Sequence, residues 1–151
     1  MLNNLDRCIL RYLQSDPSAP MAEVAEQCQT QSATVARRLD RLTTRGVLKG
    51  QHAVIDWTAL GYTAEVSLRF TLDKTNPKAF DDFLKAARHI PQVIAIQTFL
   101  GRVDVRLLVI ARDMNDYQKL YRNEILNLPH IAELEALMHV ATIKTAEALP
   151  I

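Results

Sequence analysis

The stretch Ser32–Arg45, SATVARRLDRLTTR, carries two stripes of side chains at helical spacing. Val35, Leu39 and Leu42 recur at i, i+4 and i+7, so one face of the predicted helix can bury in a small core. The second stripe carries a hydroxyl and a row of guanidinium groups, from Thr34, Arg37, Arg38, Arg41 and Arg45. Arginine forks suit phosphate oxygens and the O6/N7 edge of guanine. Taken alone, this stripe is equally compatible with a solvated charged face, and the neighbouring sequence has to decide.

Two amphipathic segments precede this helix. Asn4 to about Ser15 is the first, capped by Asn3 or Asn4. Its apolar positions follow helical spacing and are Leu5, Cys8, Ile9, Tyr12 and Leu13. Met21 to Cys28 is the second, and residues 29–31 join it to Ser32. A short turn between two helices, the second of them basic, is typical of a helix-turn-helix whose second helix enters the major groove of DNA.

A wing, meaning a β-hairpin beside the helix-turn-helix, is predicted directly after Arg45. Two short strands, Val47–Gly50 and Ala53–Asp56, flank Gln51 and His52. A wing lies against the DNA backbone or the minor groove, where Lys49 could reach a phosphate. Solubility alone explains Lys49 equally well, and His52 is expected to be a turn residue.

The positive charge of the chain is local. The whole chain has a net charge of +1, whereas residues 31–50 have five basic side chains against one acidic one. Such a cluster is the electrostatic footprint expected for binding to nucleic acid. The residues predicted to enter the groove are Thr34, Arg37, Arg38 and Arg41. The residues predicted to contact phosphates are Gln31, Ser32, Arg45 and Lys49.

Cysteine usage and hydropathy exclude several classes of protein. Cys8 and Cys28 fall on apolar stripes, so we expect two buried free thiols rather than a disulfide. Without histidines at ligand spacing they make no zinc site, and no cofactor is expected. No apolar run approaches membrane-spanning length, and the N-terminus lacks a signal pattern. We therefore expect a cytoplasmic, nucleoid-associated protein.

The first half resembles the DNA-binding domain of the Lrp/AsnC (feast/famine) transcriptional regulators. The resemblance rests on five motifs in order, which are LDRCILRYLQSD from Leu5, V-A-x-x-C from Val24, VARRLDRL from Val35, RGVLKG from Arg45 and AVID from Ala53. Family members usually have glycine at the position of Gln29 and a serine N-cap at that of Gln31. Because glutamine is a poor cap, we expect Thr30 or Ser32 to cap the helix and to shift its start slightly.

The second half shows an internal repeat of two β-α-β units. The first predicted strand is Glu65–Leu72, and Ile90–Ile94 leads into a second strand that ends near Leu100. The third and fourth strands are Val103–Ala111 and about Glu133–Ile143. The two predicted helices begin near Pro77 and at Asp113. Because both crossovers are right-handed, this repeat predicts a ferredoxin-like antiparallel four-stranded sheet with both helices on one face. The other face is bare. Since Val93–Leu100 and Val103–Ile110 are largely apolar on both faces, we expect two sheets to associate in at least a homodimer.

This half resembles the Lrp/AsnC effector-binding domain over its whole length. The shared motifs are G-x-x-D from Gly101, D-M-x-x-Y-x-x-L from Asp113, L-P-x-I from Leu128 and a closing K-T-x-x-A-L-P from Lys144. The resemblance implies dimers, often assembled into octamers. It also implies an amino acid or related metabolite bound between ferredoxin-like domains. The corresponding positions are Thr98, Gly101, Arg102, Asp104, Met114, Leu137, Met138 and His139.

Two of these positions leave the ligand open. Asp104 could pair with an α-ammonium group, or it could form a turn or a salt bridge, for example with Arg102. The family commonly has an acidic residue where Arg102 stands. That reversal is compatible with a ligand that has an extra carboxylate, with a non-standard ligand or with none. Met114 and Met138 fit a dimer core better than a ligand contact.

The sequence thus predicts an α+β chain of two domains joined by a linker. Residues 1–50 are predicted as the winged helix-turn-helix, 51–61 as wing strand and linker, and 62–151 as the ferredoxin-like domain. The predicted function is a sequence-specific, effector-modulated regulator of transcription. The alternatives are an architectural DNA-binding protein and an enzyme similar to the sirohaem decarboxylases. The enzyme would need histidines gathered at one pocket, and those of this chain are scattered at His52, His89, His130 and His139.

Overall fold

The computed structural model describes residues 2–144 and 148–151. Its contacts divide the chain into two compact units, residues 1–54 together with 143–151, and residues 55–142. The predicted boundaries placed all residues from 62 onward in the sheet domain, whereas the last residues of the chain group with the helices. Thr145–Glu147, part of the closing motif, lie outside the described residues. No helix among the described residues is long and apolar enough to span a bilayer.

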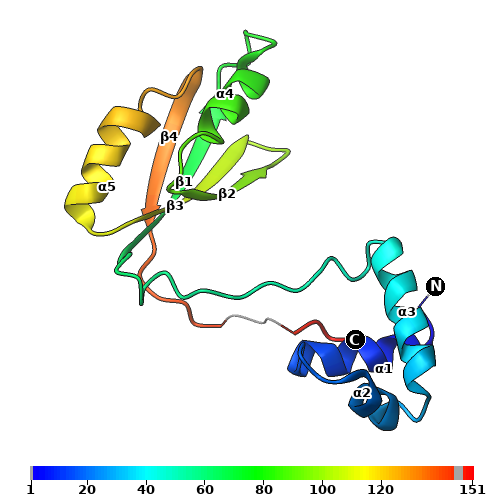
Figure 1. Ribbon diagram of the computed structural model, residues 1–151. Helices are drawn as coiled ribbons and strands as arrows, with labels where there is room; N and C mark the ends of the chain where they lie inside the picture. Colours follow the sequence, from blue (N-terminus) through cyan, green and yellow to red (C-terminus); the bar gives the residue numbers. More distant parts are fainter. Residues whose placement is uncertain (1, 145–147) are drawn as a thin grey trace. The chain divides into compact units, whose positions relative to one another are not determined.

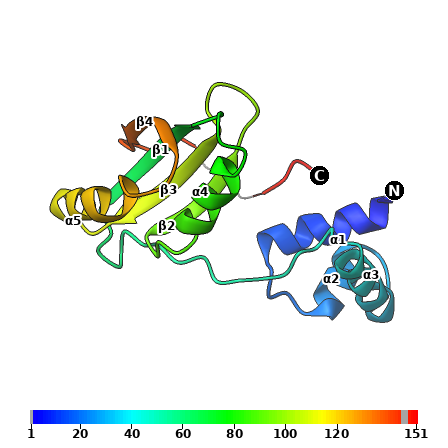
Figure 2. The same ribbon diagram turned by 90° about the horizontal axis from the view of Figure 1, so that it is seen from above.

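The helical unit consists of α1 (Asn4–Ser15), α2 (Met21–Gln27) and α3 (Ser32–Thr44), shown in Figure 2. Asn3 and Asp6 form a capping box at the start of α1, as the backbone amide of each residue donates to the side chain of the other, at 2.9 and 3.1 Å. The core is small, and its buried members are Ile9, Val24, Ala25 and Val35. The predicted trio of helices is confirmed.

The turn between α2 and α3 is tight and contains no glycine. Gln29 has a φ of 50°, which is in the left-handed region, and the amide of Thr30 donates to the carbonyl of Ala25 at 2.8 Å. Gln31 is the N-cap of α3, but its side chain makes no capping hydrogen bond. The expectation that Thr30 or Ser32 caps the helix is therefore wrong. Gln31 occupies the N-cap position, the helix begins at Ser32, and its first turn has no side-chain cap.

Cys8 and Cys28 form a disulfide, so the prediction of two free thiols is wrong. Their Cα atoms lie 5.8 Å apart and link α1 to the C-cap of α2. The periodicity correctly placed both cysteines on inward-facing stripes. It could not reveal that these stripes face each other closely enough for a bond.

The wing strands predicted at Val47–Gly50 and Ala53–Asp56 do not form. Residues 47–56 contain no strand, and the side chains of Val54 and Ile55 are 79% and 63% exposed. A two-residue hairpin loop favours Asn-Gly or Gly-containing pairs with positive φ, and Gln51-His52 supplies neither. Gln51 instead donates from Nε2 to the carbonyl of Pro17 at 2.7 Å.

The second unit has the predicted ferredoxin-like topology (Figure 1). Its elements are β1 (Ala64–Leu72), α4 (Ala79–Ala87), β2 (Val93–Thr98), β3 (Val105–Ala111), α5 (Met114–Leu120), the π-helix η1 (Tyr121–Ile125) and β4 (Ile131–Met138). The strand order is β2-β3-β1-β4, and each neighbouring pair is antiparallel. β4 ends at Met138 rather than at Ile143. Met138 pairs with Val66 of β1, and β1 begins only two residues earlier, at Ala64, so it has no residues that could pair with β4 as far as Ile143.

Both helices pack on one face of the sheet. Val66, Leu68 and Phe70 of β1 alternate into this core, where the Phe70 and Phe83 rings lie 4.8 Å apart. The opposite, open face carries the other residues of β1 and β3. In register across it, Arg69 stands between Arg106 and Glu135. The open face is thus mixed in polarity, with charged residues at one end and Leu108, Ile110 and Leu137 toward the other.

Candidate nucleic-acid interface and effector region

The exposed face of α3 presents a row of guanidinium groups. Val35 and Leu42 are buried on the opposite side of this helix, while Arg37, Arg41 and Arg45 are exposed. The ion pairs found in the described part of the chain use none of these three arginines. Thr34 lies beside them and is half-buried. Helical spacing predicted the exposure of Arg37, Arg41 and Arg45, and these three guanidinium groups are free to meet an anionic partner.

Arg38 differs from the other arginines of α3. Its Nη1 lies 3.4 Å from Oδ1 of Asp6 on α1, and the side chains are 24% and 6% exposed. The same Asp6 carboxylate accepts from the Asn3 amide in the capping box. Arg38 therefore joins α3 to α1 at a half-buried contact, a role that helical periodicity alone did not reveal.

The first turn of α3 leaves backbone donors free. Because Gln31 makes no side-chain cap, no hydrogen bond in the described chain uses the amides of Ser32 and Ala33. Amides at a helix N-terminus, together with the helix dipole, favour an anionic group such as phosphate. This geometry supports the predicted phosphate contacts of Gln31 and Ser32.

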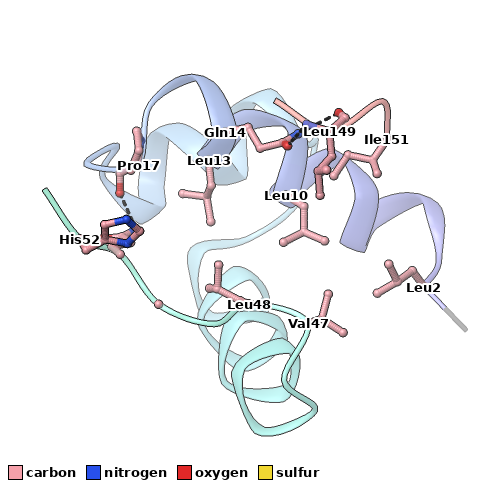
Figure 3. Close-up of a pocket in the computed structure, with 12 residues that line it drawn as sticks. Leu2, Leu10, Leu13, Gln14, Pro17, Val47, Leu48, His52, Leu149 and Ile151 are labelled. Carbon is pink, nitrogen blue, oxygen red and sulfur yellow. Dashed lines mark hydrogen bonds between the residues drawn. The ribbon is translucent and has the colours of Figure 1, made fainter. Parts of the chain in front are cut away.

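Residues 47–52 and α1 line an apolar, half-open pocket of about 430 Å³ (Figure 3). Its walls come from α1, the segment 47–52 and the last residues of the chain. They are formed by Leu2, Leu10, Leu13, Gln14, Pro17, Val47, Leu48, Gly50, Gln51, His52, Leu149 and Ile151. Lys49 is exposed beside it and does not line it. The sequence prediction missed this pocket, although Leu10, an apolar residue off the predicted stripe of α1, was a signal.

The last residues of the chain contact α1. Gln14 forms hydrogen bonds with both the amide and the carbonyl of Leu149, and Nε of Arg11 donates to the carbonyl of Ile151 at 2.7 Å. These contacts explain why residues 148–151 belong to the helical unit. Periodicity did not predict them, because they join positions more than a hundred residues apart.

Within a single chain, the eight predicted effector residues lie in two separate groups. Thr98, Gly101, Arg102 and Asp104 lie at the end of the sheet where β3 begins. Leu137, Met138 and His139 pair toward the start of β1, and Met114 follows the end of β3. Six residue steps along β3 separate the two ends, which is about 20 Å at strand spacing. A small ligand can therefore contact all eight positions only if two chains supply them.

Asp104 has internal partners for both carboxylate oxygens. Oδ2 accepts from the backbone amide of Leu72 at 2.9 Å, and Oδ1 lies 3.5 Å from Nζ of Lys74. Its side chain is only 18% exposed. Of the roles that the sequence left open, a turn-stabilising one fits this geometry, with Lys74 rather than Arg102 as ion-pair partner. Gly101 nearby has a φ of 155°, which L side chains rarely adopt.

His139, a member of the second group, contacts the first residues of β1 at the other end of the sheet. Nδ1 of His139 lies 3.7 Å from Oε2 of Glu65, and its amide donates to the Glu65 carbonyl at 2.9 Å. Met114 and Met138 are 42% and 49% exposed. Both methionines thus project where another chain could cover them.

Two family models together match most of the chain. Residues 2–43 match the AsnC-type helix-turn-helix domain, and residues 65–149 match the Lrp/AsnC ligand binding domain. The chain belongs to the Lrp/AsnC family. The resemblance of its motifs and the two-unit fold are thereby confirmed.

Relatives of this Lrp/AsnC protein are transcriptional regulators. An uncharacterized HTH-type transcriptional regulator of Haemophilus influenzae is 29% identical over 136 residues, which cover 90% of this chain and 81% of the relative. The proline dehydrogenase transcriptional activator of Rhodobacter capsulatus is 28% identical over 132 residues, covering 87% and 86%. This Lrp/AsnC chain is accordingly a DNA-binding regulator of transcription.

Solved structures share the fold over nearly the whole Lrp/AsnC chain. The transcriptional regulator NMB0573 of Neisseria meningitidis, in complex with L-Met, superposes with a TM-score of 0.90 at 22% identity, covering 99% of this chain and 97% of that one. AsnC of Escherichia coli superposes with a TM-score of 0.84 at 22% identity, covering 98% and 99%. At these identities the likeness concerns the fold.

Proposed function

We propose that α3 reads its operator through Thr34, Arg37 and Arg41, while Gln31, Ser32, Arg45 and Lys49 hold the DNA backbone. The arginine row opposite the buried stripe of α3, which is exposed and forms no ion pair within the described part of the chain, carries this proposal. Arginine can contact guanine with two hydrogen bonds, and the free amides of the first turn suit a phosphate. Arg38 is assigned a different role, since Asp6 holds it at the contact with α1. It positions the recognition helix.

Selection of bound duplexes from a random pool, followed by footprinting on genomic DNA, tests the proposal. A regulator enriches one motif and protects one or a few phased sites near promoters. An architectural protein, whose affinity comes mainly from counterion release, protects DNA uniformly and enriches no motif. Uniform protection would therefore contradict the sequence-specific regulator and support the architectural DNA-binding protein. We propose no catalytic role, and we place the protein in the cytoplasm on the nucleoid, where its DNA partner lies.

We further propose a homodimer formed through the open face of the sheet. Leu108, Ile110 and Leu137 supply its apolar part, and Arg69, Arg106 and the acidic residues of β4 lie beside them. In a two-fold arrangement each patch meets its own copy, so arginines of one chain can face glutamates of the other. Dimers can assemble further into an octamer. Sedimentation at micromolar concentration tests this, because a stable monomer would contradict it.

We propose that an amino acid or related carboxylate binds between two chains. The two groups of effector residues lie at opposite ends of one sheet, and a second chain can bring the Gly101 turn beside the His139 group. Arg102 is exposed and favours a ligand with an additional carboxylate. Calorimetry with amino acids, keto acids and dicarboxylates tests this part, and the absence of heat with every compound would reject it.

A further inference from the structure

The disulfide joins α1 to the end of α2, next to the turn that leads into α3. Cys8 lies in the middle of α1, and Cys28 is the C-cap of α2, directly before the turn that leads into α3. Both cysteines are half-buried rather than fully enclosed. A small thiol reagent can therefore approach the bond without unfolding of the whole unit.

Helix α1 holds the two helices of the helix-turn-helix by separate attachments. The disulfide attaches α1 to the end of α2, and the pair formed by Asp6 and Arg38 attaches α1 to α3 at 3.4 Å. Cys8 and Asp6 are only two residues apart on α1. These two attachments together with the small apolar core fix where α3 points relative to the rest of the unit.

The turn between the attachments needs such support. Gln29 follows Cys28 and has a φ of 50°, a conformation that residues with a Cβ atom rarely adopt. The side chains of Gln29 and Gln31 supply no cap to α3. When Cys28 is no longer tied to α1, Gln29 can leave the left-handed region more easily, and the start of α3 moves with it.

We propose that Cys8 and Cys28 are a reversible redox site, and that their oxidation tightens DNA binding by fixing the turn before α3. The inference rests on the proposed function, in which α3 reads the DNA. Proteins that act beside DNA work where small thiols keep most cysteines reduced. Disulfides in such compartments are usually transient and redox-sensing. Oxidative conditions would thus raise the fraction of protein with a pre-organised recognition helix.

The oxidant is a low-molecular-weight disulfide. One cysteine thiolate attacks a sulfur of that disulfide, forming a mixed disulfide and releasing one small thiol. The second cysteine then attacks the protein sulfur of the mixed disulfide and displaces the second small thiol. Two protein thiols and one small disulfide become one protein disulfide and two small thiols. Reduction by an excess of small thiol reverses both steps.

The wild-type full-length chain in two redox states provides the main test. Protein is equilibrated with oxidised or reduced glutathione, its free thiols are titrated, and its affinity is measured by anisotropy. The probes are the duplex enriched in the selection experiment and a mixed-sequence duplex. If the competent arrangement falls to about one tenth of the reduced population, the reduced protein binds about tenfold more weakly. Circular dichroism on the same samples shows whether the affinity change includes loss of helix.

Variants without the bond supply the control. C8S and C28S each remove it, and the double variant C8S/C28S also removes the remaining thiol. Under reducing conditions all three variants should bind DNA with the affinity of the reduced wild type, and the double variant, which has no thiol left to form a mixed disulfide, should not respond to glutathione. A response that persists in the double variant would overturn the assignment.

Three results decide the matter. Thiol loss with tighter binding supports the proposal. Thiols that stay free across glutathione potentials of about −300 to −180 mV, or equal affinity in both states, would overturn it. If neither state prefers any duplex, the function of α3 as a reader fails, while the thiol titration still reports whether the pair is oxidised.

Discussion

Arg38 and Arg41 are neighbours on α3, yet the structure gives them different surroundings. Arg41 is exposed and joins no ion pair among the described residues, whereas Arg38 is half-buried against Asp6. The Arg41→Ala variant should lose about 1–3 kcal/mol of preference for the selected duplex over random DNA. The Arg38→Ala variant should instead lower the free energy of unfolding by about 1–3 kcal/mol, because it leaves the buried Asp6 carboxylate without its cation.

Anisotropy on both duplexes and urea unfolding of both variants separate these roles. Asp6→Asn is the matched control, since it removes the same ion pair from the other side. It should resemble Arg38→Ala in stability and leave the specificity ratio near that of the wild type. A specificity loss in Arg38→Ala that Asp6→Asn does not share would show that Arg38 also contacts bases.

Tyr117 supplies a second prediction at this scale. Its hydroxyl is buried in the core of the sheet unit with no hydrogen-bond partner among residues 2–144 and 148–151, and burial raises the pKa of this phenol. Tyr117→Phe should therefore be neutral or stabilise the unit by up to about 1 kcal/mol. The sign of the pH effect follows from the raised pKa. The neutral phenol stabilises the fold fully below its unfolded pKa of about 10, and this contribution is lost as pH rises toward the folded value.

Urea unfolding between neutral and alkaline pH checks this expectation. The wild type should lose stability more steeply than Tyr117→Phe as the pH approaches 10 and above. Tyr121→Phe serves as control, because this neighbouring ring is only partly buried. A clear destabilisation by Tyr117→Phe at neutral pH would mean that the hydroxyl has a partner after all.

At the scale of elements, the turn before α3 adopts a local conformation that its sequence does not favour. Gln29 at a φ of 50° costs about 1–2 kcal/mol relative to an ordinary backbone conformation. Gln29→Gly should remove much of that cost and stabilise the helical unit by about 0.5–1 kcal/mol. Thermal unfolding of oxidised and reduced protein measures it, with the exposed Gln27→Gly in α2 as a control that should destabilise.

The disulfide sharpens this prediction. Closure of a loop of about 20 residues stabilises a fold by about 3 kcal/mol through the unfolded chain. If the bond also holds the turn, Gln29→Gly should reduce the difference in DNA affinity between oxidised and reduced protein. An unchanged difference would mean that the bond acts on the unit as a whole rather than on this turn.

Apolar periodicity predicted the helices and strands that bury one face. It failed for features that depend on contacts between segments distant in the sequence. The helices beginning at Asn4 and Ser32 and the strand of Ala64–Leu72 follow their apolar spacing almost residue by residue. The wing failed because two short strands were inferred without a turn that could join them. The bond between Cys8 and Cys28 and the pair of Asp6 and Arg38 depend on how helices face each other, which spacing within one helix does not contain.

At the scale of the whole molecule, the open sheet face links the proposed dimer to DNA reading. A single recognition helix reads one half-site, and a two-fold dimer reads two half-sites about 34 Å or a multiple apart. Leu108 lies on the open face beside Ala95 of β2 and Ser67 of β1. Leu108→Arg introduces a charge that cannot be buried between two such faces without a partner. It should shift the chain from dimer to monomer without disturbing the core on the other face.

Sedimentation and footprinting on the same preparations test this link. Leu108→Arg should sediment as a monomer, protect one half-site instead of two, and bind the selected duplex with an affinity that no longer depends on half-site spacing. Arg112→Ala is the control, since it changes an exposed residue just beyond β3 and should leave both measurements unchanged. If Leu108→Arg remains a dimer, association uses another surface. If it becomes a monomer but still protects two half-sites, each site recruits its chain independently, and the palindrome is read without the sheet interface.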